Sequence, residues 1–102
     1  MIPINLDESE ISILKELIKR YAPESEVWAF GSRVSGGSHS GSDLDLVLVN
    51  TKNPNTANIH FSKIQNAIKN SNLTFLVDIF DWADLPEHFK KEIQASKYIL
   101  FT

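Results

Sequence analysis

The chain has 102 residues, of which 42% are hydrophobic and 23% are charged, with a net charge of −3 and no cysteine. This globular composition predicts one small domain, residues 1–102, and excludes disulfides and thiolate metal sites, while the acidic balance disfavours stable binding to long DNA or RNA. No apolar run approaches the roughly 20 residues that span a bilayer, and the N-terminus lacks the basic flank of a signal peptide, so we expect a cytoplasmic protein without membrane contact.

The expected elements alternate between helices and strands along the chain. Apolar residues at helical spacing predict a first helix from Asp7 to about Tyr21, which Ala22-Pro23 ends. The later elements are a strand over 26–30, a strand over 43–49, a helix over 59–68, a strand over 73–80 and a closing helix from 86 nearly to 102. This order predicts an α/β (α+β) fold with a small mixed β-sheet flanked by helices.

The glycine- and serine-rich segment between the first two expected strands has the residue types of a phosphate-binding turn. Gly31 lacks a side chain and lets the backbone approach a ligand closely, and the Ser32 hydroxyl can bond a phosphate oxygen. Arg33 is near enough to meet a phosphate, although a solvated arginine in a polar loop is also common. Taken alone, the Gly-Ser pair is more simply explained as a turn of the chain, and the aspartates that follow favour the phosphate-binding interpretation.

Two carboxylates follow this segment at alternate positions, in Asp43-Leu44-Asp45. Because successive side chains of a strand point to opposite faces, Asp43 and Asp45 are expected on one face. Two like charges held so close repel each other, and the arrangement is costly unless water reaches both or a cation lies between them. A hard divalent ion, which prefers oxygen ligands, suits the site. The alternative is a solvated strand start with Ser42 and Asp43 as turn residues.

A third carboxylate, Asp78, stands in a run that is otherwise apolar. If its strand lies beside the Asp45 strand, three carboxylates converge and can hold two divalent ions, and they can activate an attacking hydroxyl. The alternative is an aspartate that caps the strand end or bonds a neighbouring amide. Asp81 is a weaker candidate, because its odd spacing from Asp78 puts it on the opposite face, next to an expected helix start.

The combination of Gly31-Ser32-Arg33 and Ser42-Asp43-Leu44-Asp45-Leu46 with a later strand aspartate resembles the minimal nucleotidyltransferases of the DNA polymerase β superfamily. The likeness covers most of the chain, from about Val27 through Asp78. Val34 and Ser35 replace an Ala-Arg pair that the family usually has, which removes one basic contact and leaves the metal site intact.

The resemblance implies a role for each matching residue. Gly31, Ser32, Arg33 and Ser42 would bind the nucleotide, with the first two on the triphosphate of an NTP. The carboxylates of Asp43, Asp45 and Asp78 would be catalytic and would bind Mg²⁺, with two ions possible. The implied substrate is ATP.

The resemblance also implies a partner, because family members are commonly antitoxins paired with a helical HEPN-domain toxin, and some transfer AMP to a tyrosine of that partner. A homo-oligomer is also possible. Three hypotheses follow for this chain: an adenylyltransferase that modifies a protein hydroxyl, a module that neutralises a HEPN-type partner by contact alone, and a nucleotide-binding subunit that turns over only with its partner.

Overall fold

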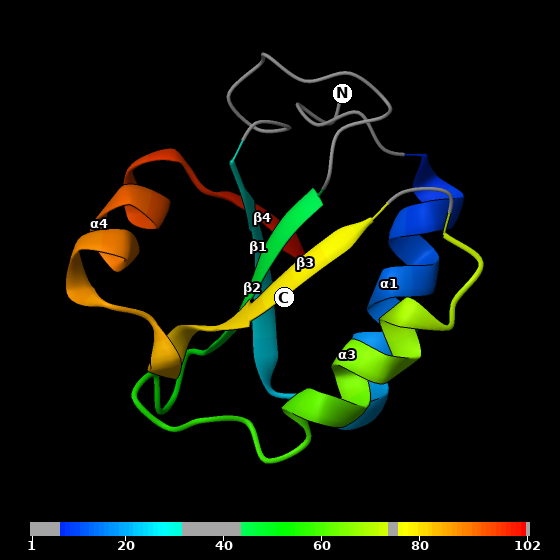
Figure 1. Ribbon diagram of the computed structural model, residues 1–102, viewed down its shortest axis with the longest axis horizontal. Coiled ribbons are helices and arrows are strands. Elements are labelled where there is room, and N and C mark those ends of the chain that lie inside the picture. The colour runs from blue at the N-terminus through cyan, green and yellow to red at the C-terminus, as the bar shows by residue number, and fades with distance from the viewer. Residues whose placement is uncertain (1–6, 32–43, 74–75, 102) are drawn as a thin grey trace.

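A computed structural model describes residues 7–31, 44–73 and 76–101 of the chain (Figure 1). The helices are α1 (Glu8–Tyr21), α3 (Phe61–Lys69) and α4 (Glu87–Ser96), with a short 3₁₀ helix η1 (Trp82–Asp84). The strands are β1 (Ser25–Phe30), β2 (Leu44–Asn50), β3 (Val77–Asp81) and β4 (Tyr98–Phe101). This arrangement confirms the predicted α/β class.

The four strands form one mixed sheet in the order β3-β2-β1-β4. Strand β1 pairs antiparallel with both β2 and β4, whereas β2 pairs parallel with β3. A parallel pair needs a long crossover connection, and the chain between β2 and β3 contains α3. Strands β3 and β4 are the two edges of the described sheet.

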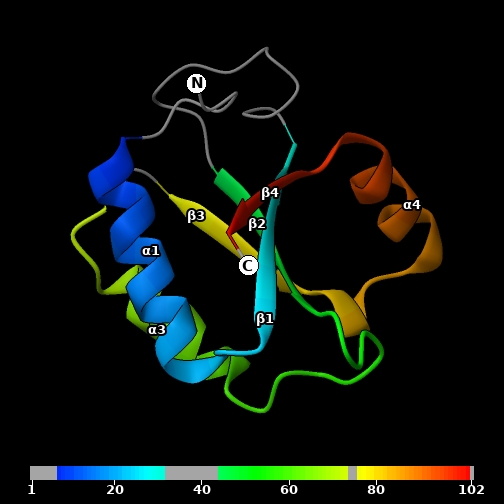
Figure 2. The same ribbon diagram turned by 180° about the vertical axis from the view of Figure 1, so that it is seen from behind.

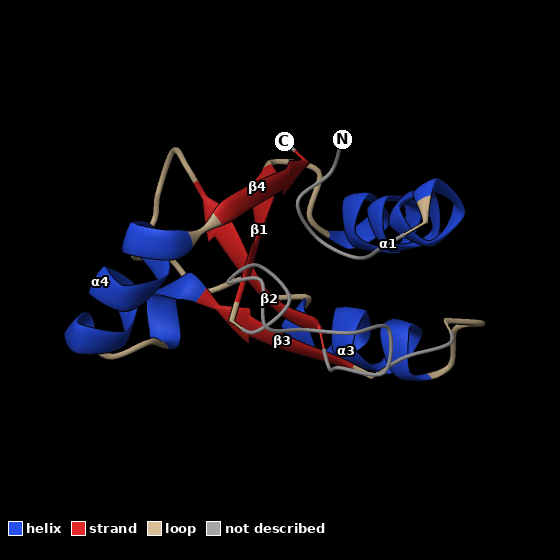
Figure 3. Ribbon diagram, turned by 90° about the horizontal axis from the view of Figure 1, so that it is seen from above, coloured by secondary structure: helices blue, strands red, loops and turns tan. Residues whose placement is uncertain are grey.

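Each face of the sheet carries its own apolar core, and Figure 3 shows α1 and α3 on one side with α4 on the other. The α1/α3 core contains these buried residues: Leu14, Ile18, Ala22, Val27, Ala29, Leu44, Leu46, Leu48, Ile64, Ile68, Ile79 and Phe101. The α4 core contains these: Trp28, Phe30, Val47, Val49, Trp82 and Ile93. Alternate residues of β1 and β2 therefore belong to opposite cores, as strand geometry requires.

Helices α1 and α3 lie side by side against the sheet (Figure 2). Leu14 and Ile18 of α1 and Ile64 and Ile68 of α3 are their buried residues, each pair spaced four apart on one helix face. None of the described helices is long and apolar enough to cross a membrane.

The closing segment differs from the sequence prediction of a helix that runs nearly to 102. Helix α4 ends at Ser96, Lys97 is extended with φ −64° and ψ 151°, and Tyr98–Phe101 forms β4. The Tyr-Ile-Leu-Phe run is rich in aromatic and β-branched residues, which favour a strand. Pairing with the edge of β1 satisfies backbone groups there and buries Phe101 in the α1/α3 core.

Replacing Leu46 with alanine tests this packing, because Leu46 lies in the central strand pair and is fully buried. We expect Leu46→Ala to lower the free energy of unfolding by about 2–5 kcal/mol, through lost apolar burial and the cavity that remains. Urea denaturation measures the change. Ile59→Ala is the control, since Ile59 is 90% exposed and its truncation should change stability by less than about 0.5 kcal/mol.

Candidate active site

Two of the predicted carboxylates lie side by side on the face of the sheet that α4 covers. The β1–β2 register pairs Phe30 with Asp45, and the β2–β3 register pairs Asp45 with Asp78. Paired residues of neighbouring strands project to the same face, so Phe30, Asp45 and Asp78 form one row across three strands. The parallel pairing of β2 with β3 thus brings together two carboxylates that are 33 residues apart in the sequence.

The two carboxylates have different surroundings. Asp45 is partly buried at the start of β2, whereas Asp78 is exposed on the edge strand β3. Like charges at directly paired positions destabilise a sheet unless something offsets them. Two neighbouring carboxylates with solvent access are donors that a hard divalent cation prefers, so this pair fits such an ion.

Gly31 follows β1 next to this row and has a backbone conformation that few other residues adopt. Its φ is +85°, in the left-handed region. A Cβ atom built at position 31 would overlap Oδ2 of Asp45 and would lie 3.3 Å from its Cγ. The missing side chain therefore makes room for the Asp45 carboxylate, a reason for glycine that the sequence did not reveal.

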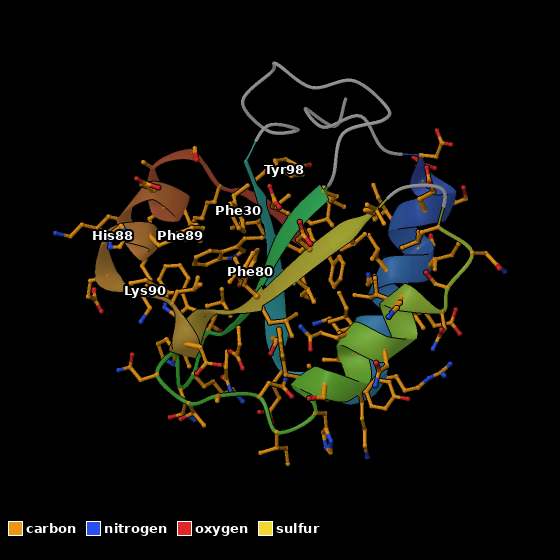
Figure 4. All side chains as sticks on the ribbon, viewed as in Figure 1. Phe30, Phe80, His88, Phe89, Lys90 and Tyr98 are labelled. Atoms are coloured by element: carbon orange, nitrogen blue, oxygen red, sulfur yellow. The ribbon has the colours of Figure 1, made fainter. Side chains whose placement is uncertain are left out.

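An aromatic cluster of Phe30, Phe80 and Phe89 lies on the same face of the sheet as the two carboxylates (Figure 4). Ring centroids are 5.8 Å apart for Phe30–Phe80 and for Phe30–Phe89, and 6.1 Å apart for Phe80–Phe89. Sequence reasoning missed this cluster, although the apolar residue at every second strand position was a signal for it. The packed rings join β3, which carries Asp78, to α4 and to β1, which pairs with the strand of Asp45.

Asp81 is separate from this site and has a structural role. It pairs with Leu48, a residue of the α1/α3 core, and is buried on the face opposite Asp78. Its Oδ2 accepts a hydrogen bond from the Asn58 backbone N–H at 2.6 Å, and its Oδ1 accepts one from Ala83 N–H at 3.4 Å. It therefore caps η1 and holds the segment that precedes α3 through the hydrogen bond from Asn58.

The remaining predicted site residues, Ser32, Arg33, Ser42 and Asp43, lie outside the described residues. Within the described part of the chain, no three His, Cys, Asp or Glu side chains come together as a metal site. The described site therefore consists of the carboxylates of Asp45 and Asp78, with Gly31 and the aromatic cluster beside them.

Comparison with known proteins gives consistent matches. Residues 12–102 match the model of the family described as "Polymerase beta, Nucleotidyltransferase". The chain is 32% identical over 91 residues to the "Probable protein adenylyltransferase MntA" of Haemophilus influenzae, a match that covers 89% of this chain and 78% of that protein.

Among solved structures, the chain resembles one described as "Crystal structure of the toxin-antitoxin with AMP-PNP". The TM-score is 0.70 at 19% sequence identity, and the match covers 94% of this chain and 73% of that one. At this identity the likeness concerns the fold, and it agrees with the mixed sheet and helices described above.

The close approach of Gly31 and Asp45 predicts that substitutions at these positions are coupled. Gly31→Ala should lower stability both by about 1–2 kcal/mol of left-handed backbone strain and by displacing the carboxylate. In an Asp45→Ala background the carboxylate is absent, so Gly31→Ala should cost at least about 1 kcal/mol less. Denaturation of the four variants of this cycle measures the coupling, and purely additive effects would contradict the described approach.

The two roles of Asp78 and Asp81 predict different effects of their substitution on stability. Asp81→Ala removes the acceptors of two backbone N–H groups and should lower the free energy of unfolding by about 1–3 kcal/mol. Asp78→Ala should leave stability unchanged or raise it slightly, because it removes an exposed charge that faces another carboxylate. Thermal unfolding of both variants checks this, and a larger loss at Asp78 would refute the assignment.

Proposed function

This chain belongs to the polymerase beta nucleotidyltransferase family and is a nucleotidyltransferase, and we propose that it transfers AMP from ATP to a hydroxyl of a protein partner. The relative from Haemophilus influenzae is a probable protein adenylyltransferase, which supports this choice of nucleotide and acceptor. The single observation that carries the proposal is the pairing of Asp45 with Asp78 on one face, with Gly31 close to the Asp45 carboxylate.

The carboxylates of Asp43, Asp45 and Asp78 are proposed to bind Mg²⁺, with room for two ions. We include Asp43 because the Asp-Leu-Asp pattern of the sequence has the alternation typical of a strand, in which alternate residues share a face. Bound Mg²⁺ would offset the negative charge of the phosphates and of the departing pyrophosphate. The fit rests on the donor set, since Asp45 and Asp78 present oxygen ligands from neighbouring strands.

The nucleotide is proposed to lie with its triphosphate on the Gly-Ser segment that follows β1 in the sequence. Ser32 and Ser42 would donate hydroxyl hydrogen bonds to phosphate oxygens, and the Arg33 guanidinium would pair with a phosphate charge. Gly31 keeps the backbone at the end of β1 close to the Asp45 carboxylate. The triphosphate would thus be held immediately beside the carboxylate row.

The reaction is an in-line displacement at the α-phosphorus. The acceptor hydroxyl oxygen forms a new bond to the α-phosphorus while the bond from that phosphorus to the bridging oxygen breaks, and pyrophosphate leaves with the electron pair. The exposed Asp78 carboxylate takes the hydroxyl proton, since among the described carboxylates of the row it is the more open to an incoming acceptor. The product is an adenylylated acceptor.

The partner is proposed to be a helical HEPN-domain toxin, with this chain as its antitoxin. The solved structure with the similar fold is of a toxin–antitoxin with AMP-PNP, which supports both the pairing and the nucleotide. A chain of 102 residues offers few walls around the second substrate, so a macromolecular acceptor can complete the site.

Substitution of the carboxylates tests the proposal. With α-labelled ATP and Mg²⁺, we expect label on the proposed HEPN-domain partner, and Asp45→Asn or Asp78→Asn should lower the transfer rate at least about 100-fold. Removing divalent ions with EDTA should abolish transfer. Asp84→Asn is the matched control, because Asp84 is exposed in η1 and lies outside the row.

Two outcomes would contradict the proposal. No label on the partner with any nucleotide or divalent ion would show that the chain is not its adenylyltransferase. Full neutralisation of the partner by a chain with both Asp43→Ala and Asp45→Ala would show that contact alone suffices.

A further inference from the structure

A groove of about 590 Å³ lies between β3 and α3. Residues of β3 form one wall, and the C-terminal half of α3 contributes Gln65 and Lys69. Asp78 also lines the groove, so the groove and the site share a wall. Its volume lies in the range of roughly 300–1,000 Å³ that is typical of ligand sites.

If the proposed function is correct, the order of the strands indicates the side from which the acceptor hydroxyl approaches the α-phosphorus. Gly31 follows β1, Asp45 lies on β2 and Asp78 lies on β3, so the proposed triphosphate site at Gly31 and the outer edge of β3, which borders the groove, flank opposite sides of the row. In an in-line displacement the attacking and leaving oxygens lie on opposite sides of the phosphorus. When pyrophosphate leaves on the β1 side, the hydroxyl must arrive from the β3 side.

The outer edge of β3 can hold an extended chain. Leu44 N–H donates to Leu76 C=O at 2.9 Å, so the backbone groups of Leu76 face β2. Because these groups alternate in direction along a strand, those of Val77 and Ile79 face outward, where the described sheet has no further strand. An added strand pairs with such an edge through its main chain.

The chemistry of the groove restricts the sequence that fits. Leu76 is 72% exposed at the entrance, and Leu73 and Ile68 continue the apolar lining. Lys69 is the one cationic side chain of the described lining and faces the groove from the helix side. An occupant should therefore carry an apolar residue for Leu76 and an acidic residue for Lys69.

We propose that this groove binds an extended segment of the acceptor protein, which pairs with the edge of β3 and presents its hydroxyl side chain to Asp78. The proposal rests on the proposed function and adds where and in what conformation the acceptor binds. The main chain of the segment forms hydrogen bonds with Val77 and Ile79. Its side chains contact Leu76 and Lys69, and these contacts determine which sequences bind.

Steady-state transfer to the helical partner protein, with labelled ATP and Mg²⁺, tests the side-chain contacts. We expect Leu76→Asp and Lys69→Glu each to raise the KM for the partner at least tenfold, while kcat and the Kd for AMP-PNP stay within twofold of the wild type. Lys69→Arg, which keeps the charge, should retain the wild-type KM. Matched controls are Ile59→Asp and Lys63→Glu, exposed changes of the same kinds outside the groove.

Amide hydrogen exchange of the wild-type chain, bound to the partner and AMP-PNP, tests the strand pairing without any substitution. The amides of Val77 and Ile79 should exchange at least tenfold more slowly in the complex, because they gain hydrogen-bond acceptors. The amides of Asp78 and Phe80 face β2 and serve as internal references with little change.

The outcomes separate this proposal from the proposed function. If the wild type transfers label but the groove variants behave like their controls, or Val77 and Ile79 gain no protection, the groove assignment is wrong and the nucleotidyl transfer stands. If the wild type neither binds AMP-PNP nor transfers label to the partner, the proposed function fails, and this inference fails with it.

Discussion

The register between β2 and β3 is the constraint on which the site depends. Burial of Leu46 and Ile79 toward α1 and α3 fixes that register, because a slip of β3 by one residue would turn Ile79 away from this core while Leu46 stays in it. Burying one such side chain contributes about 1.5–3 kcal/mol, whereas a facing pair of like charges costs up to about 1 kcal/mol. The core therefore holds Asp45 beside Asp78 despite their repulsion.

The same strands carry the residues that pack the cores and the carboxylates of the candidate site. On the α4 face, Phe30 and Phe80 pack with Phe89 next to the positions that carry the carboxylates. On the α1/α3 face, Asp81 uses both carboxylate oxygens to hold backbone N–H groups. Two aspartates three residues apart on one strand thus have separate roles, because strand geometry directs them to opposite faces.

The arrangement across the strands also suits the proposed transfer to a second protein. Its elements follow one another from the glycine at the end of β1, through Asp45 on β2, to Asp78 on the edge strand β3. A carboxylate on an edge strand is open to a large acceptor, whereas one on a central strand is flanked on both sides. The edge position of Asp78 therefore favours an acceptor that is part of another protein.

The sequence by itself determined the α/β class, the bounds of most elements and the candidate carboxylates, because strand alternation, helical spacing and the Gly-Ser and Asp-Leu-Asp patterns are local. The odd spacing between Asp78 and Asp81 also made Asp81 a weaker candidate than Asp78, and the structure then placed the two on opposite faces. Only the tertiary structure decided that 98–101 is a strand, since its pairing partner β1 is about 70 residues away in the chain. The parallel neighbour of Asp78, the room that Gly31 leaves for Asp45 and the groove against α3 likewise depend on contacts between distant segments, which no local pattern specifies.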